Sequence, residues 1–578
     1  MTAEHPHADP APADPTPEIL VDTALAELVE GEKAWGATTL AQRAALLDRI
    51  RVLASGHGAQ WVAAAARYKQ LDPDSPLLGE EWMSGPYAMA TGAGAMARSL
   101  ADLAAHRSPL HEADFGTAAG RTTVRVLPSS TFDSLLLSGF RADVWLRPGV
   151  DQATATGTAG LAQLDPTTTH GIGVVLGAGN ITSIAPLDVL YELIAHNRVA
   201  VLKLNPLTDP MFDVLSTVLE PLIALGVVRI LRGGADVGGY LVRHPSVAHV
   251  HMTGSAATHD AIVWGVGEEA LRRKAANEPL LDKPITSELG GVSPTIVLPG
   301  TWSRADIRYQ AEHIATQRLH NGGYNCVAAQ AVVLSSDWEQ KQEFLTALRE
   351  ALDQAPARTA YYPGSDQRVA SAVESYPNAE LRGGGKRVLV TGLRPEAVED
   401  LLHTEYFAPV LGVVEIAGTG AQFAQRATAA ANDEFVGTLG VNIIGHPATI
   451  KSLGADFDTM LTDLRYGTIA VNAWTALGFL TAAATWGAFP GHTIDDVQSG
   501  IGLVHNAFLI DGAERTVVRG PFRPAPRSLL HGEFALTPKP PWFVNNKSAV
   551  TTAQRLNDFA GDPRWSRLPG IFASALRG

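Results

Sequence analysis

The sequence nearly lacks cysteine, and this limits the chemistry of the protein. Among 578 residues there is one cysteine, Cys326. A single thiol excludes an intrachain disulfide framework and any metal site built from several thiolates. It also suits a reducing compartment, so we expect a cytoplasmic protein. Cys326 is therefore either an inert, buried side chain or a reactive one.

Basic residues are fewer than acidic residues. The chain has 45 Lys and Arg against 59 Asp and Glu, which gives a net charge of −14. Because such a chain repels polyanions, binding to nucleic acid is not expected. Hydrophobic residues make up 46% and charged residues 18% of the chain, a composition typical of a large compact body with few flexible connectors.

The sequence has no N-terminal apolar core of the kind found in signal peptides. Residues 1–17 are rich in proline, so a disordered leader is expected. The stretch 466–494 has no charged residue and is long enough for a membrane span, but glycine, proline and threonine interrupt it, so none is expected. There Trp474, Phe479 and Trp486 either wall a pocket for an apolar substrate or simply pack in the core.

The hydrophobic pattern changes along the chain. Residues 24–104 place apolar side chains, such as Leu40 and Leu47, at helical spacing. From residue 171, short β-branched runs alternate with amphipathic helices, the order of βαβ crossovers in a doubly wound parallel sheet. We therefore expect an α/β fold that binds ligands at the carboxyl ends of its strands. A second α/β region is predicted over 287–475.

Outside these regions, residues 138–147 alternate apolar and charged side chains, which predicts a half-exposed strand. Residues 515–545 are rich in Pro and Arg and are expected to form an extended arm. Such a segment either crosses a subunit boundary or supplies Arg contacts to a phosphate or to coenzyme A.

The surroundings of the cysteine, HNGGYNCVAAQ, contain a tight turn. Gly322 and Gly323 permit close backbone approach, and backbone N–H groups at such a turn can lower the pKa of a thiol. Upstream, SELGG places Glu288 before a Gly-Gly turn, and a carboxylate near a thiol can act as a general base for water. Taken alone, each has a plainer interpretation: a small buried hydrophobe for Cys326 and a surface residue for Glu288.

Further polar residues stand at predicted strand ends. Asn180 offers an amide donor of the kind that stabilises an oxyanion, although it could equally support a turn. Lys203 ends the strand VAVLKL, where its cation needs an anionic or hydroxyl-rich ligand. Gly254 and Ser255 lie where a strand passes into a helix, a common phosphate site. The remaining candidates lie in TEYFAPVL: Glu405 and Phe407.

In this order, the motifs resemble those of the aldehyde dehydrogenase superfamily. GN, VLKLNP, TGS, ELGG, NGGYNC, EYFAP and GTIAVN follow one another over roughly residues 30–510. The resemblance implies an oxidoreductase that uses NAD or NADP to oxidise an aldehyde to its carboxylic acid, working as a homodimer or homotetramer. It implies Cys326 as the nucleophile, Glu288 as the general base, and Asn180 with the Cys326 backbone N–H as the oxyanion hole. No metal is expected.

The same resemblance implies how the cofactor is bound. Lys203 corresponds to a ligand of the adenosine ribose, and Ser255, after Gly254, to a contact of the pyrophosphate. Glu405, with Phe407 beside it, corresponds to the residue that holds the nicotinamide ribose.

Cofactor preference stays open at this point. Pro206 stands where many NAD-preferring members have an acid, so NADP is admissible. Arg232, just before Gly233 and Gly234, is a candidate for the charge that a 2′-phosphate needs, although an Arg near a strand end is usually only solvated. His259 stands where members often have glycine.

Two alternative functions stay open. GAGN replaces the aromatic-Asn pair of many hydrolytic members, and a similar stretch occurs in acyl-reducing relatives, so a CoA-acylating aldehyde dehydrogenase or acyl-CoA reductase is the first alternative. Glu288 argues against it, because CoA-dependent members commonly lack that base. The second alternative is a catalytically silent structural or binding relative. The uncharged stretch before Pro490 favours an apolar aldehyde, aliphatic or aromatic.

The resemblance also sets the expected domains. We expect two α/β domains, a small β arm for oligomerisation and a C-terminal extension that makes this a long variant. The expected boundaries, including the leader, are as follows: leader 1–17, NAD(P)-binding domain 18–130 and 165–286, catalytic domain 287–490, arm 131–164 and 505–545, and extension 546–578.

Overall fold

The N-terminal part of the chain is helical, as its apolar spacing predicts. The computed structural model describes residues 16–397 and 399–578, so most of the predicted leader lies outside the described residues. Thr39 caps the second helix in a capping box with Gln42, and Leu47 is buried on that helix. The helices are α1 (Pro17–Ala37), α2 (Leu40–Gly56), α3 (Gly58–Tyr68), α4 (Leu78–Trp82) and α5 (Ala88–Ala104).

A six-stranded sheet follows, in the order β17-β8-β7-β4-β5-β6. Strands β4 to β8 run parallel, and β17 pairs antiparallel with β8. Every residue of β5 is buried, as expected for a parallel strand covered on both faces. The strands are β4 (Ile172–Leu176), β5 (Val199–Lys203), β6 (Val228–Leu231), β7 (Val247–Gly254), β8 (Ile285–Leu289) and β17 (Gly500–Ile501).

Helices connect these strands and pack against the sheet. The order of strands and helices confirms the predicted α/β fold with a doubly wound parallel sheet. The helices are α8 (Ile184–Ile194), α9 (Phe212–Val218), α10 (Glu220–Ala224), α11 (Ala235–Arg243), α12 (Ala256–Val263) and α13 (Gly267–Ala276).

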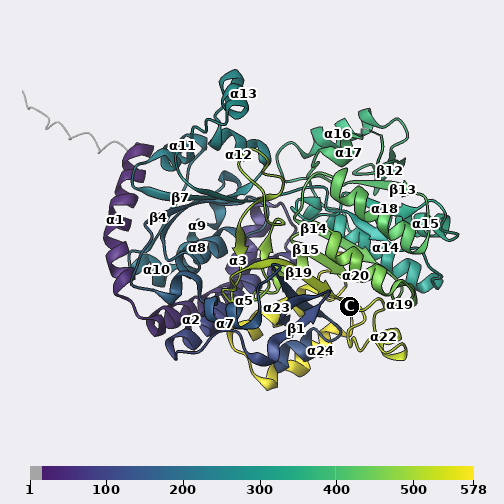
Figure 1. Cartoon of the computed structure of the whole chain (residues 1–578), viewed down its shortest axis with the longest axis horizontal. Coiled ribbons are helices and arrows are strands. Elements are labelled where there is room, and N and C mark those ends of the chain that lie inside the picture. The colour runs from purple at the N-terminus through teal and green to yellow at the C-terminus, as the bar shows by residue number, and fades with distance from the viewer. Residues whose placement is uncertain (1–15, 398) are drawn as a thin grey trace, which may run out of the picture.

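The second α/β region forms part of an eleven-stranded sheet on the other side of the molecule (Figure 1). Its parallel strands are β9 (Thr295–Val297), β10 (Ala331–Ser335), β12 (Arg387–Leu393), β13 (Val410–Ile416), β14 (Gly440–Ile444) and β15 (Thr468–Val471). Helices α14 (Arg304–Leu319), α15 (Lys341–Gln354), α16 (Ser365–Ser375), α18 (Gly420–Asp433) and α20 (Ala455–Asp463) pack around them, and β11 (Glu380–Arg382) closes one edge.

The strands of the predicted arm belong to this same sheet. Strand β19 pairs in parallel with β15, so that Thr516 lies opposite Thr468, and β3 pairs antiparallel with β19. Two more strands continue the sheet to its other edge. The arm therefore extends the chain's own sheet. These strands are β1 (Phe115–Ala118), β2 (Arg121–Leu127), β3 (Arg141–Leu146) and β19 (Ala513–Arg519).

The prediction of a half-exposed strand at 138–147 is wrong about exposure. Strand β3 forms, but all of its residues after Arg141 are buried. Its central charge, Asp143, is neutralised by Arg141, whose Nε lies 2.6 Å from a carboxylate oxygen. Because β2 and β19 flank β3 on both edges, its polar residues are enclosed as well as its apolar ones.

The C-terminal extension packs against the N-terminal helices. Helices α23 (Ala549–Gly561) and α24 (Leu568–Ala575) follow one another, and α23 contacts α2, α4 and α5. Leu556 and Phe559 share an apolar cluster with Val62 and Trp82. Among the described residues, no helix is both long and apolar enough to span a membrane.

Candidate active site

The cysteine follows a left-handed turn at the end of α14. Asn321, Gly322 and Gly323 have φ values of 54°, 72° and 84°. A Cβ atom on Gly323 would lie 3.0 Å from the carbonyl oxygen of Arg318, so this position requires glycine. The turn then places Cys326, half-buried, against Glu288 on β8.

Cys326 and Glu288 form a buried pair of proton-carrying groups. Burial, and then the neighbouring Glu288 carboxylate, raise the pKa of the Cys326 thiol well above its usual range. Burial also raises the pKa of Glu288 to about 7, and Trp486 Nε1 donates to Glu288 Oε1 at 3.4 Å. A backbone hydrogen bond at the turn lowers the thiol pKa, as expected, but burial and Glu288 outweigh it. In this state the thiol is therefore protonated, and Glu288 can accept its proton.

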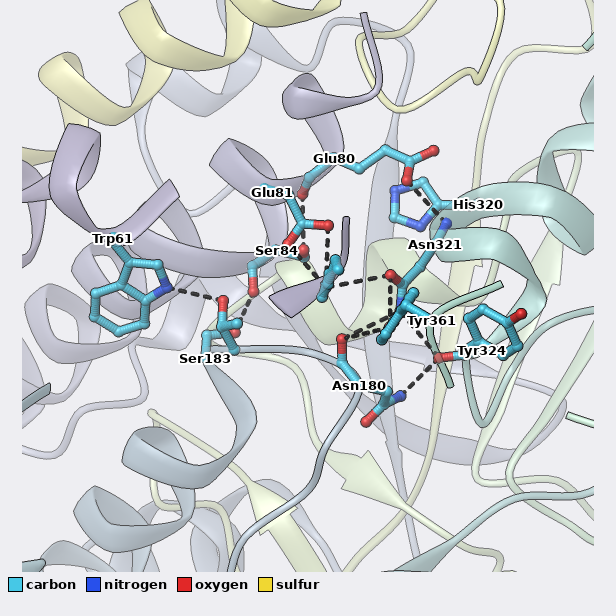
Figure 2. A network of polar contacts seen from close by, with 12 residues as sticks. Trp61, Glu80, Glu81, Ser84, Asn180, Ser183, His320, Asn321, Tyr324 and Tyr361 are labelled. Atoms are coloured by element: carbon cyan, nitrogen blue, oxygen red, sulfur yellow. Dashed lines mark hydrogen bonds and ion pairs between the residues drawn. The ribbon is translucent and has the colours of Figure 1, made fainter. Parts of the chain in front are cut away.

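Asn180 lies in the loop between β4 and α8, as its position after a strand predicts. Its side chain is buried, and Nδ2 donates to the carbonyl oxygen of Tyr324 at 2.9 Å (Figure 2). A carboxamide has two N–H groups, so this contact orients the amide and leaves the second N–H to donate elsewhere.

A small apolar cavity lies on one side of the thiol. Its volume is about 50 Å³. The three aromatic residues from the uncharged stretch, Trp474, Phe479 and Trp486, line it, so they form a pocket wall and are not only core. Trp542, which the sequence analysis did not single out, also lines it. No motif marks Trp542, because it reaches the pocket from the C-terminal part of the chain.

A larger groove of about 770 Å³ lies on the other side. It runs along the carboxyl ends of the six-stranded sheet, where the α/β pattern predicts a ligand. Ser255 caps α12 by accepting a hydrogen bond from Thr258 N at 3.2 Å. The sequence-predicted residues that line the groove are Lys203, Gly254, Ser255, Gly234, Glu405 and Phe407.

Arg232 is not among the residues that line the groove. Its guanidinium lies 4.0 Å above the ring of Phe212 and is half-exposed, with Asp213 at 3.9 Å. Arg243, at the end of α11, lines the groove instead. Since Arg243 belongs to no recognisable motif, only the packing of α11 against the sheet reveals it.

Glu405 is held in the groove with unsatisfied hydrogen-bonding capacity. Burial raises its pKa to about 8, and Oε1 is buried without a hydrogen-bond partner among the described residues. A Cβ atom on Gly290 would lie 1.9 Å from that oxygen, so the first glycine of ELGG makes room for Glu405. An unpaired buried oxygen of this kind indicates a site for a hydroxyl donor.

The groove and the small cavity meet at three side chains. Cys326, Glu288 and Asn180 line both of them. One side can therefore present an apolar molecule to the thiol while the other presents a nucleotide-sized ligand. Within residues 16–397 and 399–578, no three His, Cys, Asp or Glu side chains are grouped as a metal site requires.

The fold and this junction define an α/β protein with a nucleotide-sized groove and a thiol–carboxylate pair. The aldehyde dehydrogenase family model matches residues 169–482, which is more than half of the chain. The chain belongs to the aldehyde dehydrogenase family.

Curated relatives match parts of the chain. A D-glyceraldehyde dehydrogenase (NADP+) of Picrophilus torridus is 24% identical over 192 residues, 33% of this chain and 36% of the relative. A coniferyl aldehyde dehydrogenase of a Pseudomonas species is 24% identical over 339 residues, 55% of this chain and 66% of the relative. The chain thus spans about a third of the length of the first and just under two thirds of the second.

Solved structures share the fold. A mutant aldehyde dehydrogenase C of Pseudomonas syringae, complexed with NAD+ and octanal, has a TM-score of 0.58 and 17% identity, covering 87% of this chain and 89% of its own. An NADP-dependent glyceraldehyde-3-phosphate dehydrogenase of Bacillus halodurans, complexed with NADP, has the same TM-score and identity and covers 87% and 92%.

Proposed function

We propose that the protein oxidises an apolar aldehyde to its carboxylic acid with NAD or NADP. The observation that supports this proposal most strongly is the meeting of an apolar cavity and a nucleotide-sized groove at Cys326, Glu288 and Asn180. A nucleophile, a base and an oxyanion donor are what acyl chemistry on a thiol requires.

The residues of the groove fit a nicotinamide dinucleotide. Lys203 is buried at the end of β5 and offers a cation to ribose hydroxyls. Ser255 at the start of α12 offers a helix terminus to the pyrophosphate, and the unpaired oxygen of Glu405 accepts from a ribose hydroxyl. When bound there, the cofactor supplies the hydride acceptor. Arg243 is the cation best placed to favour a 2′-phosphate.

The side chains at the junction have separate tasks. Glu288 takes the proton of the Cys326 thiol, and the thiolate attacks the aldehyde carbonyl carbon. The oxyanion that forms accepts hydrogen bonds from Asn180 and from the backbone N–H of Cys326. After oxidation the acyl group is bound to Cys326 as a thioester. Once Glu288 has passed the thiol proton to solvent, it removes a proton from water. The water oxygen attacks the thioester carbonyl, the C–S bond breaks, Cys326 leaves as thiolate and the acid is released.

The small cavity supports an apolar substrate. Besides its aromatic wall it is lined by Ile181, Ile184, Leu480 and Val504. An alkyl or aryl group gains burial there, whereas a charged or hydroxyl-rich substrate would lose its hydration without compensation.

Water is the preferred acyl acceptor over coenzyme A. Glu288 lies where a base for water is needed. Two of the Arg residues suggested as contacts of coenzyme A are already paired within the chain: Arg523 Nε lies 3.3 Å and Arg527 Nη1 2.5 Å from the same oxygen of Asp306.

Assembly and location stay predictions. A homodimer or homotetramer is expected from the family resemblance, but the arm strands here already extend the chain's own sheet. Cytoplasmic location rests on the single cysteine.

The test is a panel of aliphatic and aromatic aldehydes with NAD+ or NADP+, each with and without coenzyme A, followed by cofactor reduction. We expect reduction without coenzyme A and release of the free acid, with no turnover in Cys326→Ser. Turnover that requires coenzyme A, or Cys326→Ser at the wild-type rate, would overturn the proposal.

A further inference from the structure

A cluster of four ionisable side chains lies buried behind the catalytic turn. Lys69 at the end of α3, Glu80 and Glu81 on α4, and Arg358 after α15 have side chains that are 0%, 5%, 1% and 7% exposed. Lys69 Nζ lies 2.8 Å from Glu81 Oε2, and Arg358 Nη1 lies 2.5 Å from Glu80 Oε2. Arg358 Nη2 also reaches Glu81 Oε1 at 3.3 Å.

Stability alone does not account for this cluster. Removing charges from water is costly, and apolar side chains of similar volume often serve a fold equally well. Although burial alone would raise it, the pKa of Glu81 is lowered by the Lys69 and Arg358 cations, so Glu81 stays ionised within the cluster. A buried, ionised cluster beside a reactive thiol calls for a functional reason.

All four side chains lie around one residue of the turn, Asn321. Its backbone N–H donates to Glu80 Oε2 at 2.9 Å. Its Oδ1 accepts from Lys69 Nζ at 3.2 Å, Arg358 Nη2 at 3.1 Å and the hydroxyl of Tyr361 at 3.1 Å. The cluster therefore holds a left-handed residue by both its backbone and its side chain.

The other end of the same carboxamide faces the reacting centre (Figure 2). Asn321 Nδ2 donates to the carbonyl oxygen of Asn180 at 3.2 Å and to that of Tyr324 at 3.1 Å. The Asn180 side chain donates to the same Tyr324 carbonyl oxygen. One amide thus joins the ion cluster to the oxyanion donor and to the residue two positions before Cys326. Donors on its Oδ1 polarise the amide and strengthen the bonds made by its Nδ2.

We propose that Asn321, held by the ion cluster, is a positioning residue that orients Asn180 for oxyanion binding. Through it, α3 and α4 set the geometry of the reaction without touching substrate. This inference rests on the proposed role of Cys326 as nucleophile, but its test does not require aldehyde turnover.

The test compares two reactions of the only thiol in the chain. Acylation by p-nitrophenyl acetate breaks the ester C–O bond, forms the Cys326 thioester and releases p-nitrophenolate through a tetrahedral oxyanion. Alkylation by iodoacetamide displaces iodide and forms no oxyanion. Neither reaction needs a cofactor. A variant that loses acylation but keeps alkylation has therefore lost the stabilisation of the oxyanion.

Two variants separate the functions of the amide. Asn321→Asp keeps an acceptor for Lys69 and Arg358 but removes the donors to Asn180 and Tyr324. Asn321→Gly tolerates the left-handed backbone and removes the whole side chain. We expect both to slow acylation about 10- to 100-fold, with alkylation by the folded protein little changed. Arg349→Gln, which breaks the pair of Arg349 with Glu380 away from the site, is the control.

A double-mutant cycle tests the path through Asn180. In an Asn180→Ala background, Asn321→Asp should cause no further loss of acylation, because the donor that it orients is gone. The inference would be overturned if the losses of the two single variants multiplied in the double variant, or if alkylation fell as much as acylation. A wild-type protein that is acylated by the ester but reduces no cofactor with aldehydes would instead overturn the proposed function.

The contribution of the ion cluster is tested with a paired replacement. Removing one ion alone leaves its partner buried and unpaired, which endangers folding. The double variant Lys69→Met with Glu81→Met removes both charges. We expect it to slow acylation more than alkylation, and equal rates of acylation in variant and wild type would show that the cluster does not act through Asn321.

Discussion

At the scale of single residues, Cys326 and Glu288 control each other's protons. Burial raises the pKa of both groups, so the resting site holds a thiol beside a carboxyl group that titrates near neutral pH. A thiol that stays protonated until a base accepts its proton is protected from oxidation and alkylation. The reactive thiolate then forms more readily when Glu288 is ionised.

The pH dependence of turnover follows from this pair. Because the pKa of Glu288 is raised to about 7, its basic form is scarce in mild acid and predominates above neutrality. We expect kcat to rise about tenfold per pH unit below this pKa and to level off above it. The measurement is kcat from about pH 5.5 to about pH 9. Glu288→Gln should lose this limb, and an unchanged limb in that variant would assign the titration to another group.

Gly290 is predicted to be essential for cofactor binding. In Gly290→Ala, the new methyl group would lie 1.9 Å from Glu405 Oε1 and displace that carboxylate from the groove. The dissociation constant of NAD(P)+, measured by fluorescence quenching, should rise about tenfold or more, as for the loss of a buried hydrogen bond. Gly56→Ala is the matched control, because a Cβ atom there meets nothing within 4 Å. Equal dissociation constants for Gly290→Ala and wild type would contradict this role of Glu405.

At the scale of elements, the substrate pocket combines distant parts of the chain. Trp542 packs edge-to-face on Phe140, with ring centroids 5.6 Å apart, and lines the small cavity together with the aromatic residues of the uncharged stretch. The size of the cavity therefore depends on a segment beyond the family-matched residues.

Shortening Trp542 should enlarge the range of substrates. In Trp542→Leu we expect the ratio of kcat/KM for octanal to that for propanal to rise about tenfold, which is the effect of accommodating one or two more methylene groups. Trp565→Leu, an exposed Trp of the same C-terminal part, is the control. An unchanged ratio in Trp542→Leu would remove this residue from the substrate wall.

Local sequence patterns predicted which strands and helices form better than they predicted how these elements are buried and which cavities they line. Short β-branched runs identified β4 to β7, and the motif order brought Cys326, Glu288 and Asn180 together. The burial of β3 could not be predicted, since its partner β19 lies far along the sequence. The same holds for Arg243 and Trp542, which reach their cavities through packing and not through a motif.

At the scale of the whole molecule, the C-terminal helices support the catalytic turn indirectly. A Cβ atom on Gly79 would lie 2.7 Å from Cβ of Ala549, so α4 and α23 approach closely. The two ion-cluster carboxylates, Glu80 and Glu81, lie on that same helix. The packing of α23 on α4 is thus connected, through Glu80 and Glu81, to the orientation of Asn321.

Deleting residues 546–578 should destabilise the protein and impair catalysis. The deletion exposes apolar side chains on α3 and α4, including Val62 and Trp82, which lie in one cluster with α23 and α24. The loss is expected to be several kcal/mol in the free energy of unfolding, measured by denaturant titration. The control is Trp565→Leu in the full-length chain, which keeps both helices. A deletion variant as stable as the wild type would contradict this view of the extension.

The central claim is that Cys326 carries the acyl group and Glu288 directs water to it. The most direct measurement is the intact mass of Glu288→Gln after brief reaction with an apolar aldehyde and NAD(P)+. We predict that the acyl group accumulates on the single cysteine, because hydrolysis is slowed more than acylation. A mass without an adduct while acid is still produced, or an adduct on any residue other than Cys326, would contradict the account.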